Sequence, residues 1–141
     1  MKHTFLLLLA TLLATSCVKL DGESYRKYSD YVNIMDVNMP DSAFIGDDIP
    51  IVVQAGAPNG CWSGLEVHIG RSTIYDSVFG FTATGLFEST NNLCAEVLVT
   101  KDSTFHFKTD TAGIYLFIAY SAAYQPIYDT LVVSDTATSK R

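Results

Sequence analysis

The residues of this chain that could do chemistry are few, and no motif groups them. His68 and His106 each fall on the polar phase of an alternating segment, with no H-x-H, H-E-x-x-H or Cys/His grouping beside them. Catalysis and metal binding need several such groups converging on one point. Asp41, Asp47 and Asp48 supply hard oxygen ligands, but their spacing is that of an ordinary turn and not of a calcium loop. We therefore expect no enzyme, no metal site and no cofactor.

The three cysteines, Cys17, Cys61 and Cys94, are the next group to explain. The first of them ends a leader in which Lys2 precedes an apolar run over 5–14. About ten apolar residues are too few to span a bilayer, which takes roughly 20. They match the apolar core of a secretory signal peptide. An odd number of cysteines in an exported protein leaves one without a disulfide partner.

The segment Ala14-Thr15-Ser16-Cys17 resembles the lipobox of bacterial lipoproteins, in which a leucine and two small residues precede the cysteine. Leu13 stands one place earlier than the leucine of that pattern. The resemblance implies cleavage after residue 16 and lipid attachment to Cys17, which makes the membrane a partner. Val18 follows where an aspartate would signal retention in the inner membrane, so the resemblance favours the outer membrane, facing the periplasm or the cell surface. Plain secretion is the alternative.

With lipid on Cys17, Cys61 and Cys94 are free to pair with each other. An exported chain favours a disulfide, and closing a loop of about 34 residues contributes roughly 3–4 kcal/mol by the chain-entropy estimate. The C-x-x-C spacing of redox proteins is absent. Trp62 follows Cys61 directly, and it either packs on the bridge or serves as an exposed binding anchor.

The charge excludes one class of partner. The sequence has 9 basic and 15 acidic residues, a formal net charge of −6. Nucleic-acid binding needs a basic stripe, and none is present. We divide the chain into a signal peptide (1–16), a lipidated N-terminus and tether (17–30), one folded domain (31–134) and a disordered tail (135–141).

Short segments rich in Val, Ile, Phe, Tyr and Thr, separated by Gly, Pro, Asn and Asp, predict an all-β domain. No later window has the 3.6-residue period of a helix. Eight strands are expected, at 31–39, 49–55, 65–69, 73–81, 93–100, 104–108, 114–120 and 127–133. The segments 41–48 and 82–92 are expected to be loops. Seven to nine strands at this spacing predict an antiparallel sandwich or barrel.

The segment Thr111-Ala112-Gly113-Ile114-Tyr115-Leu116-Phe117 resembles the immunoglobulin pattern D-x-G-x-Y-x-C, with Thr111 for the aspartate and Phe117 for the cysteine. The resemblance implies an immunoglobulin-like β-sandwich in which the Tyr115 hydroxyl bonds to the backbone upstream, forming a tyrosine corner. The missing cysteine implies that the family's usual disulfide between its sheets is absent.

In such a sandwich, Tyr120, Tyr124 and Tyr128 would border an end loop with small residues between them. Tyrosines in that setting either cap the core or form a recognition surface. Together with Trp62 they are our candidate ligand-binding residues. We expect a non-catalytic binding or assembly module of the cell envelope, with an envelope protein, a peptide or a glycan as its ligand. A structural subunit that pairs through a sheet edge and a small hydrolase or inhibitor are the alternatives.

Overall fold

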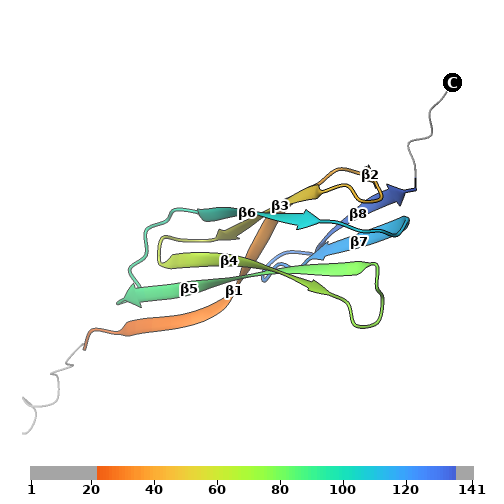
Figure 1. The fold of residues 1–141 in the computed structure, drawn as a ribbon. Helices are drawn as coiled ribbons and strands as arrows, with labels where there is room; N and C mark the ends of the chain where they lie inside the picture. Colours follow the sequence, from red (N-terminus) through yellow and green to blue (C-terminus); the bar gives the residue numbers. More distant parts are fainter. Residues whose placement is uncertain (1–21, 136–141) are drawn as a thin grey trace, which may run out of the picture.

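The computed structural model describes residues 22–135, so the leader, Cys17 and the tail beyond Asp135 lie outside the described residues. Figure 1 shows an all-β arrangement of eight strands. They are β1 (Tyr25–Asn38), β2 (Ser42–Phe44), β3 (Ile49–Ala57), β4 (Trp62–Arg71), β5 (Val78–Thr90), β6 (Val99–Phe107), β7 (Gly113–Ala119) and β8 (Ile127–Ser134). The prediction of an all-β domain is confirmed. Within residues 22–135 no helix is long and apolar enough to cross a membrane.

The strands form one curled, mixed sheet in the order β2-β8-β7-β5-β1-β3-β6, and β4 pairs with β5. Two of the pairs, β2 with β8 and β5 with β7, are parallel. The expectation of a purely antiparallel sheet is therefore wrong. Parallel pairs join strands that are distant along the chain, so no turn between neighbouring strands reveals them in the sequence.

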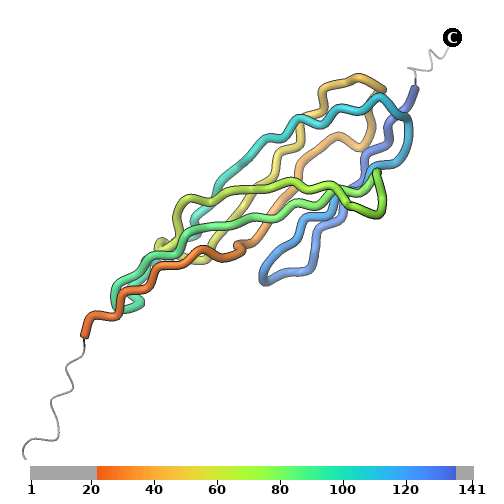
Figure 2. The backbone as a smooth tube through the Cα atoms, turned by 60° about the horizontal axis from the view of Figure 1, so that its bottom comes forward, coloured from red at the N-terminus to blue at the C-terminus, as the bar shows by residue number. Residues whose placement is uncertain are grey.

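Strand β1 joins the two halves of the sheet. Its first part, Tyr25 to Val32, pairs with β5, and its second part, Asn33 to Asn38, pairs with β3. The register shifts between Ile34 and Asp36 in the second part. Figure 2 shows the resulting elongated molecule, in which the two ends of the described chain lie at opposite tips.

The core lies between the halves of the curled sheet. Alternate residues of β3, β5, β7 and β8 point inward, and the largest fully buried side chains are Phe81, Phe117, Ile34, Ile51, Leu131 and Val53. Phe81 and Phe117 stack with their ring centroids 6.0 Å apart, and Phe79 stacks on Phe117 at 5.3 Å. Aromatic pairs of this kind add to the stabilisation that burial itself supplies.

The first strand begins at Tyr25 and not at residue 31, so the last six residues of the expected tether belong to β1. All six residues are exposed, which accounts for their mostly polar composition, and Tyr28 also stacks on Phe87 at 4.9 Å. The segment 82–92 was expected to be a loop, but most of it is strand β5. Its inward positions hold small residues such as Ala83 and Gly85, so the segment lacks a hydrophobic alternation.

Two other predicted strands have wrong boundaries. The segment 93–98 lies outside the strands, and Leu93 is 80% exposed, although its apolar residues alternate as in a strand. Residues 72–77 form a loop between β4 and β5, whereas the sequence predicted a strand from residue 73. The predicted loop 41–48 contains the short strand β2.

Candidate functional site

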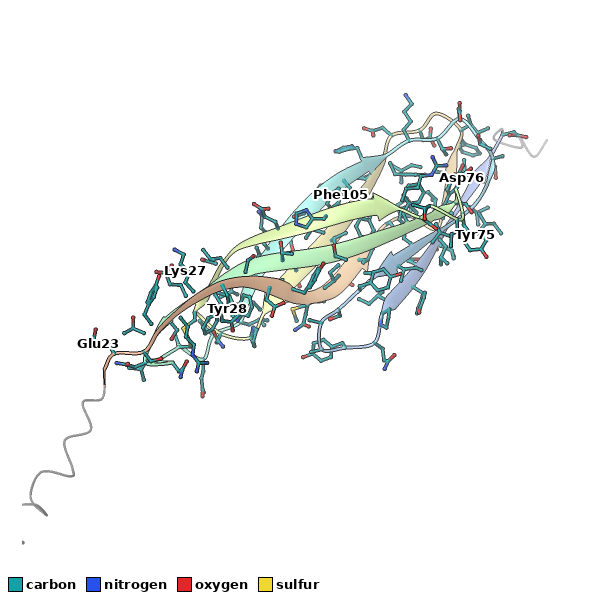
Figure 3. The ribbon with its side chains drawn as sticks, turned by 90° about the horizontal axis from the view of Figure 1, so that it is seen from below. Glu23, Lys27, Tyr28, Tyr75, Asp76 and Phe105 are labelled. Carbon is teal, nitrogen blue, oxygen red and sulfur yellow. A yellow bond between two sulfur atoms is a disulfide. The ribbon has the colours of Figure 1, made fainter. Side chains whose placement is uncertain are left out.

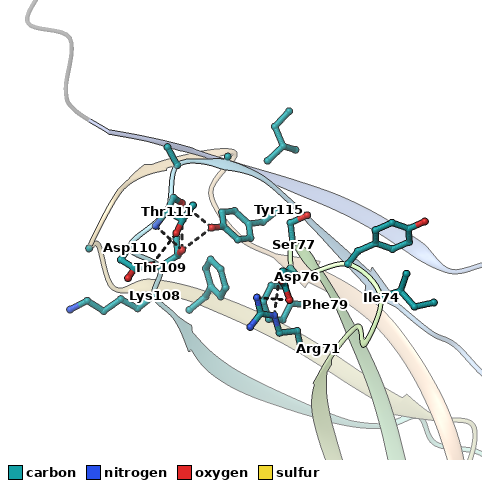
Figure 4. A pocket seen from close by; sticks show the side chains of 16 residues that line it. Arg71, Ile74, Asp76, Ser77, Phe79, Lys108, Thr109, Asp110, Thr111 and Tyr115 are labelled. Atoms are coloured by element: carbon teal, nitrogen blue, oxygen red, sulfur yellow. Dashed lines mark hydrogen bonds and ion pairs between the residues drawn. The ribbon is translucent and has the colours of Figure 1, made fainter.

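A groove of about 860 Å³ lies at one tip of the molecule (Figure 4), and we call it the distal groove. Its walls are the loop 72–77, between β4 and β5, and the turn 108–112, between β6 and β7. Figure 3 shows Tyr75 and Asp76 at this tip, and Glu23, Lys27 and Tyr28 at the other. The groove therefore lies far from the point where the described chain begins.

The loop 72–77 is held by its own polar groups. The Ser72 hydroxyl oxygen accepts hydrogen bonds from the backbone N–H groups of Ile74 and Tyr75, both at 3.2 Å. Arg71 donates through Nε to the Asp76 carbonyl oxygen (2.9 Å) and pairs with the Asp76 carboxylate at 3.1 Å. This fixed backbone leaves the side chains of Ile74 and Tyr75 79% and 64% exposed.

The opposite wall is held by Tyr115. Its hydroxyl donates to the carbonyl oxygen of Thr111 (2.8 Å) and lies 2.7 Å from the Thr109 hydroxyl. The Thr109 hydroxyl also accepts a hydrogen bond from the Thr111 N–H (3.2 Å), and the Thr109 carbonyl accepts one from the Gly46 N–H (2.9 Å). The predicted tyrosine corner at Tyr115 is confirmed.

The distal groove combines several kinds of binding group. Arg71 and Lys108 supply cationic donors, Asp76 and Asp110 supply carboxylate oxygens, and Tyr75 supplies an exposed aromatic ring. Polar groups that fix orientation beside apolar carbon are the usual composition of a ligand site. Among residues 22–135, no group of three or more His, Cys, Asp or Glu residues is placed to hold a metal ion.

The predicted tyrosine loop lies elsewhere. Tyr120 lines a second hollow of about 450 Å³ together with Asp30, Tyr31, Val32, Thr82, Ser121 and Ala122. The loop is fastened to β1, because the Asn33 Oδ1 atom accepts hydrogen bonds from the Ser121 hydroxyl (3.0 Å) and the Ala123 N–H (2.9 Å). Tyr124 and Tyr128 are each 66% exposed and line neither hollow.

Trp62 does not join these tyrosines. It is half-buried at the start of β4, where its ring lies 5.4 Å from that of Phe87 and 6.1 Å from that of Tyr28. It lines neither hollow. The two histidines also lie apart, since His68 contacts the Thr84 hydroxyl at 3.1 Å and His106 contacts the Asp48 carboxylate at 3.0 Å.

The disulfide predicted between Cys61 and Cys94 is present, with a Cα–Cα separation of 5.2 Å. It ties the segment 91–98 to the turn before β4. Cys17, the predicted lipidation site, lies outside the described residues.

One ion pair lies near the N-terminal tip. The Glu88 carboxylate accepts a hydrogen bond from the Tyr25 hydroxyl (2.8 Å) and pairs with the Lys27 ammonium (3.1 Å). The Tyr25 hydrogen bond, followed by that from Lys27, lowers the pKa of Glu88. The same contacts raise the pKa of Tyr25 and of Lys27.

The sequence did not single out the distal groove. Its walls come from two loops separated by about thirty residues, and one of them was predicted to be a strand. The only signal for it was the cluster of polar and aromatic residues in Arg71-Ser72-Thr73-Ile74-Tyr75-Asp76. No family model, no curated protein and no solved structure matches this chain.

Proposed function

We propose that this protein is a lipid-anchored, non-catalytic binding module of the bacterial cell envelope. The leader and Cys17 supply the anchor, at the outer membrane and facing the periplasm or the cell surface. The domain then presents its distal groove away from the bilayer. The observation that carries this proposal is the position of the groove, at the tip opposite to the start of the described chain.

The composition of the groove favours a polar ligand. An exposed tyrosine ring offers a flat apolar surface, and charged groups of both signs lie beside it. Sugar rings present the same combination of apolar faces and hydroxyl groups, so a glycan fits this set of groups better than an apolar molecule. Because Ser72 and Tyr115 already hold both walls, binding requires little ordering of the protein.

The fold that we propose is an immunoglobulin-like sandwich with altered pairing. The tyrosine corner and the division of β1 between two strand partners support this assignment. The parallel pairing of β5 with β7 departs from the family pattern. A fold of this kind is compatible with many functions, so the binding proposal depends on the groove alone.

The alternative function is a structural subunit that pairs through a sheet edge. Among residues 22–135, the strand edges without a partner include the outer edges of β4 and β6, β1 over Tyr25 to Val32, and β8 over Ile127 to Leu131. The β1 and β8 edges each carry a side chain that occupies one of their backbone N–H groups. The Asp30 carboxylate accepts a hydrogen bond from the N–H of Tyr31, and the Asp129 carboxylate accepts one from the N–H of Thr130, both at 2.8 Å.

Strand alternation places both of these N–H groups on the open edges. The Ser24 carbonyl accepts a hydrogen bond from the Asn91 N–H, so the backbone groups of Ser24 point toward the β5 side. Successive residues of a strand direct their backbone groups to alternate edges, so the N–H of Tyr31, seven residues later, points away from β5. The Val132 N–H donates to the Asp41 carbonyl beside β2, on the outer edge of β8. The N–H of Thr130, two residues earlier, points to the same outer edge. Charged residues at open edges oppose strand addition. These contacts oppose strand addition at the β1 and β8 edges, and the outer edges of β4 and β6 remain for a structural subunit to use.

Site-specific photo-cross-linking in cells tests the proposal. A diazirine side chain at Tyr75 probes the distal groove, one at Tyr124 probes the tyrosine loop, and one at Thr104, exposed on β6, serves as the control. The proposal predicts a discrete adduct from position 75 and none from position 104. An adduct from position 124 alone would move the site to the tyrosine loop. Absence of adducts at both 75 and 124 would contradict a binding module.

A further inference from the structure

The tip opposite the distal groove exposes a group of large apolar side chains, which we call the proximal cap. Its members and their exposed fractions are Leu93 (80%), Leu98 (54%), Val97 (52%), Tyr25 (57%) and Tyr28 (45%). Three of them belong to the segment 91–98, and two belong to the beginning of β1. Large apolar side chains exposed toward one tip of a domain mark a candidate contact surface.

The proximal cap is fixed in place by bonds on both sides. The disulfide from Cys94 to Cys61 and the hydrogen bond from the Gly60 N–H to the Ala95 carbonyl (2.8 Å) hold it to the turn before β4. Asn91 donates to the Ser24 carbonyl (2.7 Å) and accepts from the Ser24 N–H (2.8 Å). Leu93 is therefore exposed on a segment fastened at both ends.

The position of the cap in the chain indicates what it faces. Seven residues, 18–24, lie between Cys17 and Tyr25, and the eight steps from one Cα atom to the next span at most about 29 Å in a fully extended chain. Figure 3 shows Glu23, Lys27 and Tyr28 together at this tip. If Cys17 holds lipid in a bilayer, the proximal cap is the part of the described domain closest to that bilayer.

The charges at this tip do not favour electrostatic attraction to a membrane surface. The segments at this tip carry two cationic residues, Arg26 and Lys27, and three anionic ones, Glu23, Glu88 and Glu96. Lys27 is already paired with Glu88. Contact with a membrane would therefore depend on the leucines and tyrosines. Tyrosine is enriched at the boundary between headgroups and acyl chains, where its ring is in apolar surroundings and its hydroxyl stays wet.

We propose that the proximal cap docks on the bilayer that holds the Cys17 lipid. The domain then contacts the membrane through this tip and has a fixed orientation relative to the bilayer. The occupant of this surface is the boundary between the headgroups and acyl chains of a phospholipid bilayer. This inference rests on the proposed lipid anchor. Docking would hold the distal groove at the far side of the domain from the membrane.

A chemical tether tests the docking independently of what the cell attaches to Cys17. In the mature chain from Cys17 onward, the disulfide leaves Cys17 as the one thiol able to react with maleimide. It is coupled either to a maleimide lipid in phosphatidylcholine vesicles or to a small soluble maleimide. Amide hydrogen exchange is then compared over 91–98, with 72–77 at the opposite tip as the internal control.

The vesicle-tethered protein is expected to exchange more slowly over 91–98 than the soluble conjugate, with no change over 72–77. Leu93→Asp should abolish this slowing, because the charge opposes entry into the apolar boundary. The matched variant Ile74→Asp, equally exposed at the other tip, should retain it. Equal exchange over 91–98 in the two conjugates, or slowing that survives Leu93→Asp, would overturn the docking. Absence of lipid on Cys17 in cells would contradict the proposed lipid anchor. The comparison of hydrogen exchange in the two maleimide conjugates would still test the docking.

Discussion

The hydroxyl of Tyr115 donates a hydrogen bond to the carbonyl oxygen of Thr111, four residues earlier, at a distance of 2.8 Å. Tyr115 is 8% exposed, and its ring packs on that of Phe107 at 5.1 Å. One side chain thus joins the apolar core to the wall of the distal groove. The contact links the stability of the fold to the shape of the proposed binding site.

Replacing Tyr115 by phenylalanine should keep the packing and remove the hydrogen bond. Thr111 and Thr109 would lose a partner, so we expect the free energy of unfolding to fall by about 1–2 kcal/mol. Urea denaturation measures this change. Tyr124→Phe is the matched control, because its side chain is 66% exposed and should change stability by less than about 0.5 kcal/mol. Equal effects of the two substitutions would contradict a structural role for the Tyr115 hydroxyl.

Gly85 tests the packing beneath β5. A Cβ atom at this position would lie 2.8 Å from Leu65 Cδ2 and 3.1 Å from both Trp62 and Val32. Gly85→Ala should therefore cost about 1–3 kcal/mol through overpacking. At Gly70 a Cβ meets nothing within 4 Å, so Gly70→Ala should be neutral or slightly stabilising. Thermal unfolding of both variants checks the prediction, which fails if Gly85→Ala is as stable as Gly70→Ala.

The disulfide should contribute strongly to stability, because it closes a loop across a sequence separation of 33 residues. The double variant Cys61→Ala/Cys94→Ala is expected to lose roughly 3–4 kcal/mol of unfolding free energy. Reducing agent should destabilise the native protein and leave the double variant unaffected, as followed by urea denaturation. A native protein whose stability is the same with and without reductant would show that the bridge adds little.

The contacts of Glu88 predict a pH dependence. Its pKa is lowered in the folded state, first by the Tyr25 hydroxyl and then by Lys27, so its contribution to stability is present above the ordinary carboxyl pKa. That contribution is lost as the pH falls through the lowered value. In Tyr25→Phe, the pKa of Glu88 should rise toward its ordinary value. Carboxyl-carbon NMR titration measures it, and an unchanged titration in the variant would rule out Tyr25 as the main cause.

The aspartates at the open edges of β1 and β8 should limit self-association through these two edges. In the double variant Asp30→Ala/Asp129→Ala, the N–H groups of Tyr31 and Thr130 lose their local acceptors and become available for strand pairing. We expect dimers or larger species in sedimentation velocity at concentrations where the native chain is monodisperse. Asp36→Ala/Asp41→Ala removes the same charge from exposed sites and should not associate; association of both double variants would point to charge alone.

Most of the features that the sequence predicted correctly are local. The disulfide was predicted from three cysteines, one of which was assigned to a predicted leader, and the tyrosine corner was predicted from a segment of seven residues around Tyr115. Alternating apolar residues in 49–55 and 127–133 correctly indicated strands β3 and β8. For the tyrosine corner and the two strands, the residues that determine the structure lie close together in the chain, whereas the disulfide spans 33 residues and was predicted from the number of cysteines.

The features that the sequence missed depend on contacts between distant segments. Nothing near Gly80 indicates that β5 runs parallel to β7, because the partner, Ile118, lies 38 residues away. The alternation of Leu93 and Val97 suggested a strand, yet these side chains are exposed at the proximal cap. The distal groove also requires two separate loops to meet at one tip.

The chemical state of Cys17 determines whether the protein is held at the membrane by lipid. The protein is extracted from washed membranes with detergent, and the intact mass and the N-terminal peptide are determined by mass spectrometry. We expect a chain that begins at Cys17, carries acyl groups on that residue and stays with the membrane until detergent is added. A chain that begins elsewhere, carries no lipid on Cys17 and washes off in buffer would contradict the anchor, and with it the proposed arrangement of the domain on the membrane.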